Sequence, residues 1–188
     1  IYTPKGENIN LSNIFFDFRG IYGDLSLEEN LKDYLLGIVK EQKVFLGYLA
    51  NLAVRNKPPL GFFKTFVVEK SGEHKDKLNL KIKGIAPIVD IIRLFSLEKG
   101  IRETSTLERI EVLKGKHTVV RDYADEIIYA FEFLMLLRMR YQYEQVLKGN
   151  MPNNFIDPES LSNLEKKLLK DTFQLISKLQ DILIERYK

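Results

Sequence analysis

Apolar residues recur every three or four positions along most of this chain, which is the spacing of one face of an α-helix. The pattern predicts a mainly α fold, a bundle of about five helices. The longer helical segments are 27–38, 45–52, 85–98, 119–148 and 160–187. A short helix over about 105–113 joins two of them, and Pro58-Pro59 ends the second.

Two alternating segments predict a small amount of β structure. In residues 13–20 (NIFFDFRG), aromatic and charged side chains alternate with the period of two that a strand requires. This pattern predicts one N-terminal strand. Residues 64–69 and 78–83 also alternate, and the polar stretch SGEHKDK joins them, which predicts a β-hairpin or an extended arm.

Residues 85–98 are apolar on almost every face, and a helix that is hydrophobic all round is buried. This helix nevertheless carries Asp90 and Arg93, three residues apart and therefore on one side. Two interpretations stay open. One is an internal ion pair with helix caps, and the other is an anion site, because arginines and hydroxyls near a helix N-terminus bind phosphate. The residues that would complete an anion site follow directly: Arg102, Thr104, Thr106 and Arg109.

Two other polar groups allow both a structural and a functional interpretation. Arg138, Gln142 and Gln145 lie on one face of the long helix, where they either satisfy neighbouring backbone groups or bind a polar ligand. Asp17 with Arg19 forms either a surface salt bridge or, through Asp17, part of a metal site. A single carboxylate is a weak signal, because hard cations usually take two or more.

Composition narrows the function classes. The chain has 29 basic and 26 acidic residues, a net charge of +3, and this mixed surface gives no electrostatic case for nucleic acid. No cysteine is present, which fits the cytoplasm, and residues 127–137 form the longest nearly uncharged run, too short to span a membrane. His74 and His117 are expected to be surface or hydrogen-bonded histidines rather than metal ligands. The chain opens at Ile1 without a signal peptide, and we expect it to be a piece of a longer polypeptide.

Several segments taken together resemble one family. They are FFDFRGIYGD (15–24), PLGFF to STLERI (59–110), FLMLLRMRYQYEQ (133–145) and NNFIDPESLSNLEKKLLKDTF (153–173). They are similar to bacterial nucleotidyltransferases in which a cyclic-nucleotide-binding module and paired CBS domains precede a polymerase-β-like core. A helical substrate-binding domain ends such chains, which are relatives of the uridylyltransferases that modify the PII signal protein.

The resemblance implies that residues 1–40 are the C-terminal end of the catalytic core and that residues 41–188 are the helical substrate-binding domain. Asp17 is similar in setting to the third carboxylate of such cores, which implies a role in catalysis and in binding Mg²⁺. The residues that the resemblance places in substrate binding are Arg19, Asp24, Lys81, Asp90, Arg93, Arg102, Thr104, Thr106, Arg109, Arg138 and Gln142.

The function implied is the positioning of a nucleotide, or of a protein or small-molecule acceptor, for transfer from an NTP by a parent enzyme. The Mg²⁺ ligands would lie mostly outside this chain, which should be inactive alone. The alternative is a regulatory or oligomerisation module that relays CBS or cyclic-nucleotide signals. The expected partners are the NTP, the acceptor and the preceding domains, with a homodimer left open and with neither nucleic acid nor membrane.

Overall fold

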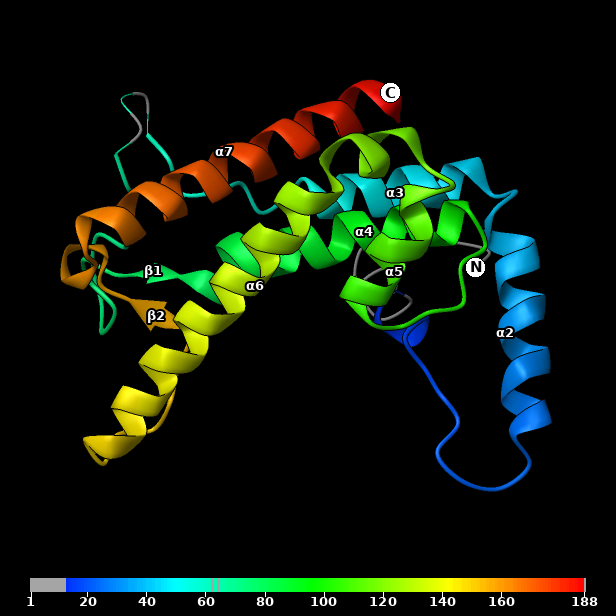
Figure 1. Ribbon diagram of the computed structural model, residues 1–188, viewed down its shortest axis with the longest axis horizontal. Coiled ribbons are helices and arrows are strands. Elements are labelled where there is room, and N and C mark those ends of the chain that lie inside the picture. The colour runs from blue at the N-terminus through cyan, green and yellow to red at the C-terminus, as the bar shows by residue number, and fades with distance from the viewer. Residues whose placement is uncertain (1–12, 62, 64, 188) are drawn as a thin grey trace. The chain divides into compact units, whose positions relative to one another are not determined.

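The fold is described from a computed structural model over residues 13–61, 63 and 65–187 (Figure 1). Within these ranges the chain is mainly helical, as the periodicity predicts. The α-helices are α2 (Leu25–Val39), α3 (Lys43–Ala53), α4 (Ala86–Glu98), α5 (Thr106–Lys114), α6 (Thr118–Leu147) and α7 (Asn163–Arg186). The shorter elements are strand β1 (Leu78–Asn79), the π-helix η1 (Lys81–Ile85), strand β2 (Phe155–Ile156) and the 3₁₀ helix η2 (Pro158–Ser160).

The chain divides into two compact units that are interleaved in the sequence. The first unit takes the residues up to 53, then 89–124 and 183–188. The second unit takes 54–88 and 125–182. Helices α4, α6 and α7 therefore each begin in one unit and end in the other.

The core of the first unit contains most of α4. Every residue from Ile91 to Leu97 is buried, which confirms that this helix is enclosed. The helix ends just before Gly100, which adopts a φ of +63°, a left-handed conformation that glycine accepts without strain. The N–H of Ile101 then donates to the carbonyl of Ser96 at 2.9 Å and closes the last turn.

The core of the second unit forms where α6 and α7 meet η1. Leu134 of α6 and Phe173 of α7 are fully buried. A Cβ on Gly84 of η1 would lie 3.0 Å from Leu134 Cδ1 and 3.4 Å from Phe173 Cε1. Gly84 is therefore a close approach of backbone to side chains, and a larger residue there would push the neighbours apart.

The apolar stripe that marks α2 in the sequence does not face the core. Leu27 is 70% exposed and Tyr34 is 66% exposed, while Leu36 and Val39 on the other side are buried. Lys32 is also buried, with its ammonium 2.7 Å from Glu28 Oε1. The helix thus has two apolar faces, and only one of them is covered.

The predicted N-terminal strand over 13–20 is wrong. Residues 13–15 are helical, and the N–H of Asp17 donates to the carbonyl of Ile14 at 3.0 Å. The N–H of Phe18 donates to the carbonyl of Phe15 at 3.2 Å, so this segment satisfies its backbone locally. The short alternation was misleading because a strand also needs a partner, and no strand of the described residues pairs with this one.

The predicted hairpin between 64–69 and 78–83 is also wrong, although Lys64 itself lies outside the described residues. Leu78 pairs with Ile156, and Asn79 with Phe155, in an antiparallel sheet of segments distant in the sequence (Figure 1). Around the SGEHKDK stretch only a turn forms, in which Glu69 exchanges backbone hydrogen bonds with Lys77 and Asp76. The chain turns helical directly after Asn79, because the Asn79 side chain accepts from the N–H of Ile82 at 3.0 Å.

Across the described ranges, no helix combines the length and the apolar character needed to cross a bilayer. This agrees with the sequence, in which charged residues interrupt every long apolar run.

Candidate functional site

The most concentrated group of charges in the first unit surrounds Asp17. Arg93 of α4 donates from Nε to both carboxylate oxygens of Asp17 at 3.2 Å and also from Nη2. Arg109 of α5 donates from Nη2 to Asp17 Oδ1 at 2.7 Å. One carboxylate from the N-terminal turn therefore joins arginines that lie 76 and 92 positions later in the chain.

A second carboxylate closes the group on the other side. Arg93 Nη1 donates to Asp90 Oδ1 at 2.9 Å, across one turn of α4 as the spacing predicts. Asn13 Nδ2 donates to the same oxygen at 3.0 Å. We call Asn13, Asp17, Asp90, Arg93 and Arg109 the Asp17 cluster.

The two arginines of the Asp17 cluster are almost entirely enclosed. The side chain of Arg93 is 8% exposed and that of Arg109 is 2% exposed, against 29% for Asp17. Arg109 Nε also donates to the carbonyl of Glu103 at 2.7 Å, while its Nη1 is buried without a hydrogen-bond partner among the described residues. Enclosed guanidinium groups depend on their counter-ions, because an unpaired buried charge is costly.

The two carboxylates of the cluster respond differently to their surroundings. Burial alone would raise the pKa of Asp17, but the hydrogen bonds and charges of Arg93 and Arg109 outweigh it and hold that pKa below its ordinary value. Burial raises the pKa of Asp90 above its ordinary value despite Arg93. The fold therefore stabilises the charge on Asp17 and disfavours the charge on Asp90.

The Asp17 cluster is an internal ion-pair network. The sequence predicted the contact of Arg93 with Asp90 but not its contact with Asp17. Both oxygens of Asp17 accept from arginines, so a Mg²⁺ ion there would have to displace them. Within the described residues, no three His, Cys, Asp or Glu side chains gather into a metal site. These residues do not form a Mg²⁺ site by themselves, and a metal role for Asp17 stays a prediction.

The other predicted site residues of the first unit lie outside the cluster. Arg102 is exposed and pairs with Asp33 of α2. Thr104 is partly buried, and Thr106 opens α5, where the N-cap Ser105 makes no side-chain hydrogen bond to the helix. Asp24 is the N-cap of α2 and accepts from the N–H of Ser26 at 3.0 Å.

Arg19 and Lys81 are solvent-exposed, and no hydrogen bond or ion pair of either is found among the described residues. Arg19 follows the helical turn that carries Asp17, and it forms no salt bridge with that carboxylate. Lys81 belongs to the second unit, where it opens η1. The surface salt bridge considered for Asp17 and Arg19 is therefore wrong, because Asp17 is held by the arginines of α4 and α5.

In the second unit, the polar ladder of α6 binds a loop. Arg138 Nε donates to Asn154 Oδ1 at 2.7 Å, and Gln142 Nε2 lies 3.4 Å from the same oxygen. Gln145 Oε1 accepts from the backbone N–H of Asn153 at 2.6 Å. The ladder thus holds the segment that leads into β2. Only Gln145 satisfies a backbone group there, because Arg138 and Gln142 bond the Asn154 side chain. Ligand binding by Arg138 and Gln142 stays a prediction.

Sequence reasoning missed one further cluster of the first unit. Glu98 accepts from Arg186 at 2.6 Å and from the hydroxyl of Tyr187, and these contacts lower its pKa against the opposing effect of burial. His117 lies beside Glu98, 4.0 Å from Nε2 to the nearer oxygen. The pairing of residues 98 and 186 leaves no local signal in the sequence, because each looks like an ordinary helix-end charge.

His117 is buried and makes no side-chain hydrogen bond among the described residues, which contradicts the expectation of a surface or hydrogen-bonded histidine. Neither ring nitrogen has a hydrogen-bond partner among the described residues. The ring stacks on Phe95 with centroids 4.0 Å apart. Burial lowers the pKa of His117 to about 4, and the charge of Arg186 adds to the effect. His74 is instead half-buried and stacks on Phe155.

A family model described as "Putative nucleotidyltransferase substrate binding domain" matches residues 43–187 of the chain. The match includes all four predicted site residues of α4 and α5, which are Asp90, Arg93, Thr106 and Arg109, and it begins at the first residue of α3. Comparisons with curated proteins and with solved structures gave no match.

Proposed function

Because this chain belongs to the family of nucleotidyltransferase substrate-binding domains, we propose that it positions a nucleotide or its acceptor and leaves the transfer itself to a catalytic core. The single observation that carries the proposal is the family match over 43–187. The acceptor would be a protein or a small molecule. The NTP, Mg²⁺ and the core with its CBS domains are the partners proposed with it, in the cytoplasm, a setting that a chain without cysteine fits.

The engagement of Asp17 and Asp90 by arginines supports the proposal that catalysis belongs to a separate core and not to this chain. Two-metal phosphoryl transfer needs carboxylates with oxygens free to bind the ions. The oxygens of Asp17 are engaged by Arg93 and Arg109, and Asp90 accepts from Arg93 and Asn13. The Asp17 cluster then serves to fix the N-terminal turn against α4 and α5.

For the nucleotide itself, we propose the exposed surface at the start of α5. Arg102 offers a guanidinium there, and Thr104 and Thr106 offer hydroxyl groups beside the first turn of the helix. Helix N-termini with arginines suit phosphate oxygens. Arg93 and Arg109 would act on this surface only indirectly, because both are enclosed and paired.

The first test of the proposal is activity. Residues 1–188, incubated with Mg²⁺, labelled NTPs and a panel of protein and small-molecule acceptors, are expected to transfer no label above background. The physical reason is that, among the described residues, no three or more His, Cys, Asp or Glu side chains gather where they could hold a metal ion. Measurable turnover that disappears in an Asp17→Asn protein would contradict the proposal and give Asp17 a catalytic role.

The second test is nucleotide binding, measured by thermal melts across NTP concentrations. A ligand at a hundredfold excess over its Kd stabilises a fold by about 2.7 kcal/mol, and Arg102→Gln should remove most of that gain. The matched control is Arg121→Gln, since Arg121 is also exposed and paired with one carboxylate, Asp122. Equal nucleotide effects in the two variants would contradict the assignment of Arg102.

One observation favours the alternative, a regulatory or oligomerisation module. The stripe of α2 exposes Leu27, Leu31, Tyr34 and Ile38 at helical spacing, and a contiguous exposed apolar face is typical of an interaction surface. The same melts distinguish the two functions. For a regulatory or oligomerisation module, the melting temperature is expected to rise with protein concentration and to be independent of nucleotide concentration.

A further inference from the structure

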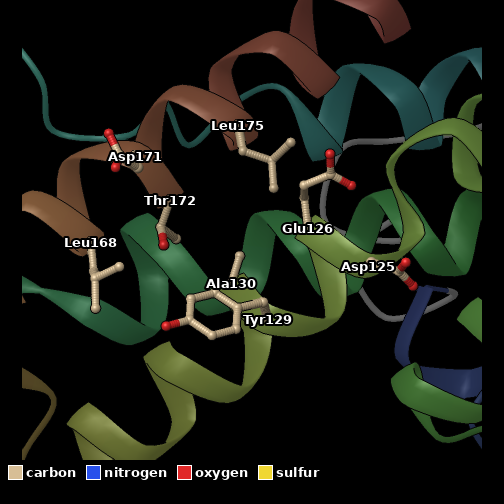
Figure 2. Close-up of a pocket in the computed structure, with 8 residues that line it drawn as sticks. All are labelled: Asp125, Glu126, Tyr129, Ala130, Leu168, Asp171, Thr172 and Leu175. Carbon is tan, nitrogen blue, oxygen red and sulfur yellow. The ribbon is translucent and has the colours of Figure 1, made fainter.

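A pocket of about 410 Å³ lies between α6 and α7 within the second unit (Figure 2). From α7 it is lined by Leu168, Thr172 and Leu175, which lie four and three residues apart and so share one face of the helix. From α6 it is lined by Ala130 and Tyr129, among others. The volume falls within the range of about 300–1,000 Å³ that is typical of small-molecule sites.

The hydroxyl of Thr172 is a polar group in this largely apolar pocket. Thr172 is only 5% exposed as a residue, and it lines the pocket. A threonine hydroxyl can both donate and accept a hydrogen bond. Thr172 therefore offers a hydrogen-bonding group to a ligand in this pocket.

The charges that line the pocket all have one sign. Asp125 and Glu126 of α6 and Asp171 of α7 contribute carboxylates, and the described residues that line the pocket include no lysine or arginine. The ring of Tyr129 adds an aromatic surface, which attracts cations through its face. An apolar interior with a carboxylate rim is complementary to a cation on an apolar body and repels an anion.

We propose that this pocket binds a small organic cation, an ammonium or guanidinium group on a short apolar body. The body occupies the space between Leu168, Leu175 and Ala130. The charged end lies among the carboxylates, and the hydroxyl of Thr172 accepts a hydrogen bond from that same end. This site goes beyond the proposed function, since none of its residues belongs to the Asp17 cluster or to the surface at the start of α5.

The experiment compares three probes that share one apolar body: 4-phenylbutylamine, 4-phenylbutanol and 4-phenylbutanoate. Binding to residues 1–188 is followed by methyl NMR signals of Leu168 and Leu175, which need no activity assay. The amine is expected to bind about tenfold more tightly than the carboxylate, with the alcohol between them. Equal affinity for the amine and the carboxylate, or no binding of any probe up to its solubility limit, would overturn the proposal.

Three variants locate the probe. Glu126→Gln, at an exposed position, should weaken the amine several-fold and leave the alcohol unchanged. Thr172→Val, nearly equal in shape, should weaken both the amine and the alcohol. The matched control is Glu132→Gln, an exposed glutamate of α6 that does not line the pocket. Amine binding that Glu126→Gln and Thr172→Val leave unchanged would place it elsewhere and refute the site.

Discussion

Replacing Asp17 with asparagine is expected to lower the free energy of unfolding by about 3–5 kcal/mol, the usual loss when one partner of a buried ion pair is removed. The reason is that Arg93 and Arg109 would both lose the charge that compensates their burial. Chemical denaturation of the two proteins at pH 7 measures the difference. Few exposed single substitutions have an effect of this size.

Asp90→Asn is the matched control, because it changes the other carboxylate of the same cluster. The pKa of Asp90 is raised by burial, so the fold gains little from its charge, and the amide oxygen can still accept from Arg93 and Asn13. We expect a loss of about 1 kcal/mol or less. If the two variants lose equal stability, the view that Asp17 provides the main counter-charge is wrong.

Acidification from pH 6.5 to 4 is expected to remove about 3 kcal/mol of stability through His117 alone. The pKa of His117 is lowered from 6.5 to about 4 in the fold, chiefly by burial. Between these values the unfolded chain binds a proton that the folded chain does not, so stability falls as the pH falls. The contribution is fully present above pH 6.5 and is lost by about pH 4.

His117→Phe tests this expectation, because the new ring can still stack on Phe95 and cannot titrate. Unfolding free energies of both proteins are measured every half unit between pH 4 and 7, and their difference isolates His117 from Asp17 and Glu98. His74→Phe is the matched control, since His74 also stacks on a phenylalanine, Phe155. A His117→Phe protein with the same acid sensitivity as the parent would show that another group causes the loss.

The helices were predictable because their signal is local and periodic. The enclosed segment 85–98 and the pair of Asp90 with Arg93 need only the 3.6-residue repeat, and α4 confirms both. Gly100 likewise marks the helix end through its own backbone preference. The long α6 and α7 follow from the same repeat, which persists over many turns and so leaves little ambiguity.

The errors concern elements that depend on partners far away in the sequence. Alternation predicts that residues 78–83 can be extended, but it cannot show that Leu78 pairs with Ile156. The ion pairs of Asp17 were missed for the same reason, since Arg93 and Arg109 follow it 76 and 92 positions later in the chain. The burial of His117 is a third case. A single polar residue just before an amphipathic helix gives no repeating pattern, so the sequence does not indicate whether its side chain is exposed or buried.

The interleaving of the two units has a consequence for how this protein tolerates shortening. Residues 183–186 end a helix that lies mostly in the second unit, yet they belong to the first. Removing that short tail would take Arg186 and Tyr187 away from Glu98 and expose the neighbourhood of His117. A proteolytic cut just before residue 183 would therefore act on the unit that holds Asp17, and no single cut along the chain releases either unit intact.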